Sequence, residues 1–329
     1  MTAQPLNTSQ AAFAPLNTAY RTVFAPDRLS IGLVVPIESY PDRPTPTMTD
    51  HIKRVQLAES LGFAAVWLRD VPFDVPSFGD AGQIFDPFVY LGSLASQTKR
   101  IALGVASIIL PLRHPVHTAK AAATVDTLSD GRLLLGIASG DRPEEYPAFD
   151  TDYHSRGERF RSAYDYLRAL STPRPQVAND WGTVGGGIDL LPKPVADRLP
   201  LLVTGGSQQS PEWLATHADG WMTYPRPAPT QARLISNYRS AIARAGLTDK
   251  PVMEPLYVDL VDDPLAPPQP IHLGLRLGVN ALRNYLMSRQ AIGVNHIALN
   301  LRFNQADIET TLQTIAADLL PHFDHKERS

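Results

Sequence analysis

A group of small polar residues stands directly behind a short apolar stretch near the middle of the chain. The apolar stretch, residues 199–203, is typical of a buried strand. The next residues are Thr204, Gly205, Gly206, Ser207 and Gln208. Ser210 and Pro211 then suit the start of a helix. Glycines let a backbone approach a ligand closely, and free N–H groups near a helix start can hold a phosphate. The pattern favours a phosphate site over the alternative, in which the two glycines only make a tight turn.

Other apolar stretches also end in residues that can contribute to a site. They are Arg69 and Asp70 after residues 63–68, Ala106 and Ser107 within residues 101–110, Ser139 and Gly140 after residues 132–138, and Arg226 after residues 221–224. Because α/β folds bind ligands at the carboxyl ends of their strands, we expect these residues to face one pocket. Most of them are small and neutral and offer hydrogen bonds, which suits a planar cofactor that carries its own chemistry.

The composition disfavours several other kinds of site. The chain has no cysteine, which rules out disulfides, thiolate metal sites and cysteine nucleophiles. Its histidines show no local ligand spacing with carboxylates, so we expect no metal site. The signatures of P-loop enzymes, zinc proteases and α/β-hydrolases are also missing.

The overall charge points to a small-molecule ligand. The 329 residues carry a net charge of −3, so we expect no basic surface for nucleic acid. The first residues lack the charged and apolar segments of a secretory signal, and no apolar run is long enough to span a membrane. We therefore expect a cytoplasmic protein that binds neither nucleic acid nor a membrane.

Strand-like and helix-like stretches alternate along most of the sequence. Eight such units in a row predict a parallel sheet closed into a (β/α)8 TIM barrel, formed by residues 29–329 as a single domain. The rival is an open doubly wound sheet, but its G-x-G-x-x-G motif is absent after the first strand. Residues 173–198, rich in Pro and Gly, indicate a hairpin excursion. Residues 1–28 are expected to form an extended arm, either disordered or laid over a partner subunit.

Residues 112–150 combine two motifs that belong together. A helix runs into L-S-x-G-R, and a strand then carries L-G-x-x-S-G, which ends at Ser139 and Gly140. In these motifs the sequence resembles the luciferase-like flavin monooxygenase family. The resemblance covers most of residues 29–321 and includes the Gly-Gly-Ser loop and the Ala-Asp-Gly before the sixth strand. It is specific for the family and not for a substrate.

The resemblance implies a barrel that binds FMN or a 5-deazaflavin at its carboxyl face. It implies a cis, non-proline peptide between Ala106 and Ser107, a phosphate loop at residues 205–208, and Ser139 and Gly140 beside the flavin. The excursion at residues 173–198 would cover the site, and a homodimer is expected.

One departure from the family concerns the residues after the second strand, where many relatives carry a histidine. This chain has Arg69 and Asp70 there. Arg69 would stabilise a developing negative charge on flavin or peroxide, and Asp70 would hold the Arg69 guanidinium in place. The alternative is a structural ion pair at the barrel rim. Arg226 either binds an acidic substrate or is simply solvated.

The leading expectation is a monooxygenase in which reduced FMN, supplied by a partner reductase, activates oxygen to oxidise a small organic substrate. One alternative is a deazaflavin-dependent oxidoreductase that transfers hydride. Another is a non-catalytic, flavin-binding subunit.

Overall fold

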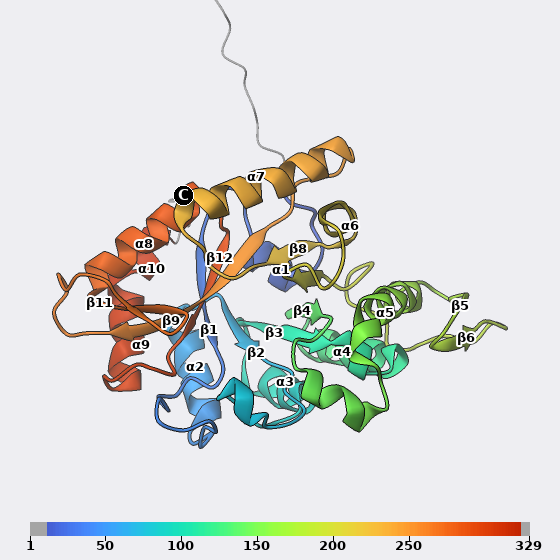
Figure 1. Cartoon of the computed structure of the whole chain (residues 1–329), viewed down its shortest axis with the longest axis horizontal. Coiled ribbons are helices and arrows are strands. Elements are labelled where there is room, and N and C mark those ends of the chain that lie inside the picture. The colour runs from blue at the N-terminus through green and yellow to red at the C-terminus, as the bar shows by residue number, and fades with distance from the viewer. Residues whose placement is uncertain (1–11, 324–329) are drawn as a thin grey trace, which may run out of the picture.

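Eight parallel strands close into a barrel in the computed structural model, which describes residues 12–323 (Figure 1). Each strand pairs in parallel with both of its neighbours, and the pairing of β8 with β9 completes the ring. The strands are β1 (Ser30–Val34), β2 (Ala65–Leu68), β3 (Ala102–Ile109), β4 (Leu133–Ala138), β7 (Leu201–Thr204), β8 (Gly220–Met222), β9 (Val252–Leu260) and β12 (His296–Asn300). The closed ring confirms the predicted (β/α)8 barrel.

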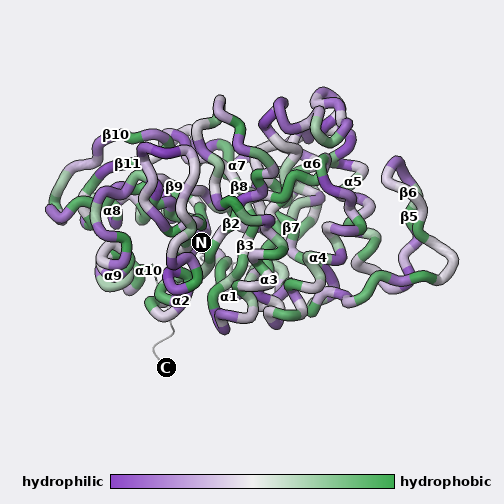
Figure 2. The backbone as a smooth tube through the Cα atoms, turned by 90° about the horizontal axis from the view of Figure 1, so that it is seen from below, coloured by the Kyte–Doolittle hydropathy of each residue, from purple (hydrophilic) through white to green (hydrophobic). Residues whose placement is uncertain are grey.

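Helices between the strands form the outer layer. They are α2 (His51–Leu61), α3 (Pro87–Gln97), α4 (Pro115–Leu128), α5 (Arg156–Leu170), α6 (Pro211–His217), α7 (Ala228–Arg244), α8 (Val279–Ala291), α9 (Ile308–Asp318) and α10 (Leu320–Phe323). Asp86, His114, Ser210 and Asp307 each cap a helix by accepting a hydrogen bond from a backbone N–H of its first turn. The hydrophobic segments gather in the central strands, and hydrophilic segments follow the outer loops (Figure 2).

The barrel interior combines large side chains with small ones. A Cβ on Gly104 would lie 2.2 Å from the ring of Trp67, so only glycine fits opposite this indole. Trp67 Nε1 donates to His296 Nε2 at 2.8 Å, and His296 Nδ1 lies 2.7 Å from Ser30 Oγ. Burial lowers the pKa of His296 to about 3, so the ring is neutral at physiological pH.

A short helix, α1 (Thr18–Val23), closes the amino end of the barrel. Tyr20 is buried, and its hydroxyl donates to the backbone oxygen of Asp219 at 2.6 Å. Asn17 Nδ2 donates to the backbone oxygen of Leu133 at 2.7 Å. The prediction of an extended arm was therefore wrong for residues 12–28, because their apolar side chains cover the open end of the chain's own barrel. Residues 1–11 of the predicted arm lie outside the described residues.

The excursion at residues 173–198 contains the predicted hairpin, formed by β5 (Val177–Asn179) and β6 (Gly182–Val184). It lies against the outer sides of α4 and α5 and projects away from the barrel (Figure 1). His114 Nε2 donates to the backbone oxygen of Trp181 at 3.0 Å, and the Arg159 guanidinium lies 4.2 Å over the Trp181 ring. The excursion therefore does not cover the barrel mouth, contrary to expectation.

The Pro-rich segment after β9 forms a second hairpin. Its strands are β10 (Gln269–Ile271) and β11 (Gly274–Leu277), and β11 pairs in parallel with the carboxyl half of β9. Within residues 12–323, none of the helices has both the length and the apolar character needed to cross a lipid bilayer.

Candidate active site

Three neighbouring strands present small residues to the carboxyl mouth of the barrel. They are Ala106 on β3, Ala138 and Gly140 at the end of β4, and Thr204 on β7, and each is partly accessible to solvent. The rest of the ring carries large polar side chains: Arg69 follows β2, Tyr257 lies on β9 and Arg302 follows β12. The mouth therefore has an accessible half of small residues and a half filled by charged and phenolic groups.

The two predicted residues on β3 lie in the small half of the mouth. The peptide bond between Ala106 and Ser107 is cis, as the resemblance implied. The Ser107 hydroxyl contacts the hydroxyl of Thr204, which in turn lies 3.2 Å from Met222 Sδ. The ends of β3, β7 and β8 thus meet beside the strand end of β4.

The loop after β7 has the backbone shape of an anion cradle. Gly205, Ser207 and Gln208 have φ values of +56°, +44° and +62°, in the left-handed region. The hydroxyl of Ser207 donates to the backbone oxygen of Thr204 at 2.8 Å and holds the turn. The backbone N–H groups of Gly206, Ser207 and Gln208 find no hydrogen-bond acceptor among residues 12–323. Adjacent free N–H groups in such a turn form a concave site for an anion.

The helix after this loop contributes less than the sequence suggested. Ser210 caps α6 as predicted, accepting from the Trp213 N–H at 3.1 Å. However, α6 has only seven residues, so its dipole is small. The loop itself therefore supplies the free donors.

Arg156, which the sequence reasoning missed, stands at the start of α5 next to this loop. A Cβ on its neighbour Gly157 would lie 2.7 Å from the Cβ of Gln208, and Gln209 Nε2 donates to the Gly157 oxygen at 2.8 Å. The Arg156 guanidinium lies 3.8 Å over the ring of Tyr153. Its buried Nε has no partner in the described part of the chain. An arginine at the first turn of a helix that faces a glycine loop was the signal available in the sequence.

Ser139 and Gly140 lie in the mouth but interact mainly through their backbone. The hydroxyl of Tyr146 donates to the backbone oxygen of Ser139. Gly140 has a φ of +80°, and a Cβ there would lie 2.8 Å from the Tyr146 hydroxyl. Gly140 is therefore required for the turn that leads out of β4.

Asp70 does not hold Arg69, so that part of the prediction was wrong. Its buried carboxylate receives two hydrogen bonds from Arg113, from Nε at 2.8 Å and from Nη2 at 2.7 Å. The backbone N–H of Ile109 adds a third at 3.1 Å. Asp70 thus ties the end of β2 to the end of β3, and it faces away from the barrel axis because side chains alternate along a strand.

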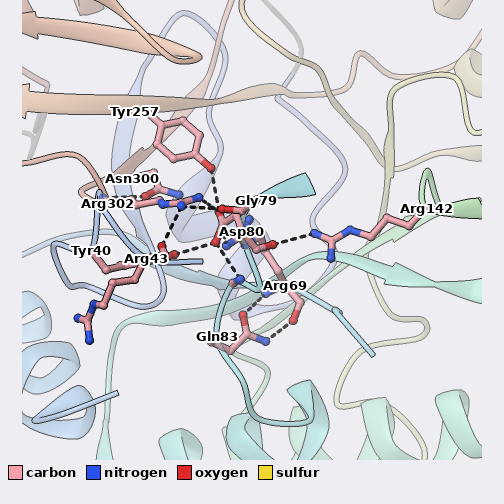
Figure 3. Close-up of polar contacts among 11 residues, drawn as sticks. Tyr40, Arg43, Arg69, Gly79, Asp80, Gln83, Arg142, Tyr257, Asn300 and Arg302 are labelled. Carbon is pink, nitrogen blue, oxygen red and sulfur yellow. Dashed lines mark hydrogen bonds and ion pairs between the residues drawn. The ribbon is translucent and has the colours of Figure 1, made fainter. Parts of the chain in front are cut away.

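Asp80, in the loop between β2 and α3, takes the place that had been assigned to Asp70 (Figure 3). Its Oδ2 lies 3.0 Å from Arg69 Nη2 and 3.1 Å from Arg302 Nη1. Its Oδ1 accepts from the Tyr40 hydroxyl at 3.2 Å and from the Gly82 N–H at 2.9 Å. These hydrogen bonds and the Arg69 and Arg302 charges lower the pKa of Asp80 against the opposing effect of burial. An ionised Asp80 therefore fastens the loop across one half of the mouth.

Only one edge of the Arg69 guanidinium is held, the edge with Nη2, which pairs with Asp80. Gly82 packs against the same edge, because a Cβ there would lie 2.8 Å from Arg69 Nη2. The backbone of Arg69 is fixed by Gln83, whose Oε1 accepts from the Arg69 N–H at 2.8 Å. Arg69 Nη1 has no hydrogen-bond partner among the described residues, and 20% of the side chain is exposed. This guanidinium is therefore fixed in place while one of its N–H groups remains available.

A second arginine connects the loop between β2 and α3 with the segment after β4. Arg142 Nη2 donates to the backbone oxygen of Asp80 at 3.2 Å (Figure 3), and its Nη1 lies 3.9 Å from Glu145 Oε1. Glu145 is 1% exposed, and burial raises the pKa of its carboxyl to about 6. Two loop segments at the mouth are thus joined through one guanidinium.

The Arg226 side chain forms hydrogen bonds within its own loop. Its Nη1 donates to Thr223 Oγ1 at 2.9 Å and to the backbone oxygen of Tyr224 at 3.1 Å. Between residues 12 and 323, no cluster of three His, Asp or Glu side chains is placed to hold a metal ion.

A closed (β/α)8 barrel with a non-proline cis peptide after β3 and a glycine loop after β7 has the architecture that the sequence motifs implied. Residues 29–258 match the family model described as luciferase-like monooxygenase, so the chain belongs to this family. An uncharacterised protein of Mycobacterium tuberculosis is 32% identical over 229 residues, which are 64% of this chain and 80% of that protein.

Two solved structures share the fold. An F420-dependent secondary alcohol dehydrogenase in complex with an F420–acetone adduct has a TM-score of 0.74 at 17% identity, over 90% of this chain and 99% of that one. A type II Baeyer–Villiger monooxygenase from Pseudomonas putida in complex with FMN has a TM-score of 0.71 at 14% identity, with the same coverage. The fold therefore serves both FMN-dependent monooxygenases and F420-dependent oxidoreductases.

Proposed function

We propose that the protein is a flavin-dependent oxidoreductase, and specifically a monooxygenase that uses reduced FMN and oxygen on a small organic substrate. Family membership supports an oxidoreductase. The observation that carries the proposal is the pairing of two features at one mouth: the accessible small residues on β3, β4 and β7, and the free N–H groups of the loop after β7. The first leaves room for a planar ring and the second suits its phosphate.

The donor set fits a flavin phosphate. A phosphate needs several donors that converge on one point, and the Gly206, Ser207 and Gln208 N–H groups provide them. Arg156, with its buried and unpartnered Nε, adds a positive charge beside them. Bound reduced FMN supplies the two electrons that activate oxygen.

The chain's own residues then orient the cofactor and shield it. The segment from residue 71 to residue 86, fastened by Asp80, lies along the polar half of the mouth and would limit the access of water from that side. Arg69 presents its available N–H toward the mouth, where it would hold negative charge on a bound ligand. We also propose that a separate reductase supplies the reduced FMN and that the protein forms a homodimer.

A deazaflavin is the second candidate cofactor, and one observation favours it. A cleft of about 360 Å³ lies directly beside the proposed phosphate site. His154, Arg161, Gln208 and Gln209 line it together with the acidic residues Asp152 and Glu158. FMN ends at its phosphate, whereas F420 continues into a longer tail that would use this cleft. In that case the reaction is hydride transfer and needs no oxygen.

The cofactor is identified by binding and by turnover. The purified chain is titrated with FMN and with F420, and the protein with reduced flavin is then exposed to oxygen. We expect FMN to bind at micromolar concentration and the bound reduced flavin to be oxidised at a rate that the protein changes. Tight F420 binding with FMN excluded would replace the proposal by hydride transfer. Tight FMN binding with no effect on the reaction with oxygen would indicate a flavin-binding subunit, and failure of both cofactors to bind would overturn the function.

A further inference from the structure

The polar half of the mouth contains two arginines that share one carboxylate. Arg69 and Arg302 share the single carboxylate of Asp80, and no other carboxylate lies within ion-pair distance of either arginine among residues 12–323. The third arginine, Arg142, has its own carboxylate, because its Nη1 lies 3.9 Å from Glu145 Oε1. Buried charges are normally matched, so an unmatched guanidinium at a ligand site favours an anionic ligand.

One guanidinium in this group is free to bind a ligand. Both terminal nitrogens of Arg302 are engaged, Nη1 by Asp80 and Nη2 by the backbone oxygens of Arg43 and Gly79 at 3.0 and 2.7 Å. Its Nε has no partner among the described residues but is buried. Arg69 keeps its Nη1 without a partner in the described part of the chain. Its rigid mounting by Asp80 means that a ligand would not have to immobilise the side chain.

Two phenols stand next to this free N–H. The Tyr257 hydroxyl lies 3.5 Å from Asp80 Oδ2, beside the Arg69 guanidinium (Figure 3). Tyr224 is 50% exposed. Tyr224 follows β8, which pairs with β9, the strand that carries Tyr257. Burial and the charge of Asp141 raise the pKa of the Tyr224 hydroxyl, and the charges of Arg69 and Arg142 lower it. The Tyr257 hydroxyl already donates to Asp80, so a carboxylate on Arg69 would find its hydroxyl donor in Tyr224.

Exposed aromatic rings adjoin the charged group. Phe78 is 42% exposed and lies 4.5 Å from the Arg142 guanidinium. Phe73 and Phe149 are 47% and 40% exposed, and their ring centroids are 6.0 Å apart. Exposed aromatic side chains gathered on the loops of a barrel mouth are typical of a binding surface for apolar ligand groups.

We propose that the substrate is an amphipathic organic anion whose carboxylate binds Arg69 between Tyr224 and Tyr257, while its apolar part rests against Phe73, Phe78 and Phe149. The proposal rests on the proposed function, because it assigns a substrate class to the same mouth. The phosphate loop after β7 lies on the opposite half, so the cofactor phosphate and the substrate carboxylate occupy separate places.

The test compares phenylacetate with phenylacetamide, its neutral counterpart of the same shape. Their dissociation constants are measured at pH 7 by calorimetry on the FMN-loaded protein and on the protein without flavin. A hydrogen bond to a charged group predicts that phenylacetate binds at least about tenfold more tightly than phenylacetamide. Arg69→Gln should abolish this preference and leave phenylacetamide binding unchanged.

The matched control is Arg226→Gln, which also removes one positive charge from the loops at the mouth but should keep the full preference. Tyr224→Phe is a second variant that is safe for folding, because the ring is half exposed, and it should reduce the preference about threefold. Equal binding of the two probes by the unaltered protein would overturn the proposal, as would a preference that survives Arg69→Gln.

The anionic group could also be the ring of reduced FMN. If Arg69→Gln raises the dissociation constant of reduced FMN about tenfold and leaves the phenylacetate preference intact, the substrate assignment is wrong. Arg69 then binds the flavin ring. If FMN does not bind at all, the proposed function fails. The phenylacetate preference of the flavin-free protein still tests the carboxylate subsite in that case.

Discussion

The carboxylate of Asp80 and the guanidinium of Arg69 lie 3.0 Å apart at the barrel mouth, although eleven positions separate them in the sequence. The same carboxylate oxygen lies 3.1 Å from Arg302, which follows the last barrel strand. A residue in a loop thereby joins the first and last parts of the barrel at the point where the ligand is expected. The loop between β2 and α3 owes its position to this contact.

Replacement of Asp80 by asparagine should destabilise the fold. The change leaves two largely buried arginines without their shared counter-ion, which typically costs about 3 kcal/mol in the free energy of unfolding. Urea denaturation measures the loss. Asp74→Asn, an exposed position in the same loop, is the matched control and should change stability by less than about 0.5 kcal/mol. Equal effects of the two substitutions would show that the ion pairs of Asp80 do not stabilise the fold.

The pair of hydrogen bonds from Arg113 to Asp70 should stabilise the fold through its two-point geometry and not through charge alone. Arg113→Lys keeps the charge but loses the two parallel hydrogen bonds, so we expect a loss of about 1 to 2 kcal/mol in the free energy of unfolding. Arg100→Lys, at an exposed site before β3, should have no measurable effect. Unchanged stability of Arg113→Lys would mean that the pair acts only as a point-charge contact.

Glu145 should make the unaltered protein less stable as the pH rises from 4.5 to about 6. Burial raises the pKa of its carboxyl from 4.5 to about 6, so the folded state holds this proton more tightly than the unfolded state does. The contribution is present below pH 4.5 and is lost as the pH passes 6, by about 2 kcal/mol. Between pH 4.5 and pH 6, the free energy of unfolding of Glu145→Gln should therefore rise by about 2 kcal/mol relative to that of the unaltered protein.

Unfolding by urea at pH 4.5 and at pH 7 measures the difference between the two proteins. Glu144→Gln, an exposed neighbour, should show no such pH-dependent gain. A constant difference between Glu145→Gln and the unaltered protein at both pH values would contradict a raised pKa.

The hydroxyl of Tyr20 should contribute measurably to closing the amino end of the barrel. Tyr20→Phe leaves the backbone oxygen of Asp219 without its donor at 2.6 Å and should cost about 1 to 2 kcal/mol. The ring still fills its buried site, so the barrel should keep its circular dichroism spectrum. Thr22→Ala, on the exposed side of the same helix, is the control. An unchanged melting temperature for Tyr20→Phe would argue against a stabilising role for α1.

The barrel could be predicted from the sequence because its strands are apolar runs at regular spacing. Most of these runs have four or more residues, which is long enough for each to be recognised alone. Helix α1 could not, because six residues are too few for a helical period to stand out from an Ala- and Asn-rich segment. The strand β11 was missed for a related reason: its partner is the far half of β9, which no local pattern reveals.

The candidate site divides in the same way. The glycine loop after β7 and the strand ends at Ser107 and Gly140 were found because their position follows from strand order. Asp80 was missed because a loop residue has no periodicity, and its partner Arg302 is more than two hundred positions away. Asp70 was paired with Arg69 on sequence proximity, although adjacent residues on a strand point to opposite faces.

Phosphate binding by the loop after β7 is tested most directly with Gly206→Asp. Gly206 has an ordinary φ, and the nearest atom to an added Cβ is the Gln209 oxygen at 3.6 Å, so the backbone tolerates a side chain there. The dissociation constants of FMN and of riboflavin, which lacks the phosphate, are measured for the unaltered protein, Gly206→Asp and the neutral control Gly206→Asn. We predict that the unaltered protein and Gly206→Asn bind FMN at least about tenfold more tightly than riboflavin and that Gly206→Asp loses this preference. Equal binding of FMN and riboflavin by the unaltered protein, or an undiminished preference in Gly206→Asp, would contradict a flavin phosphate at this loop.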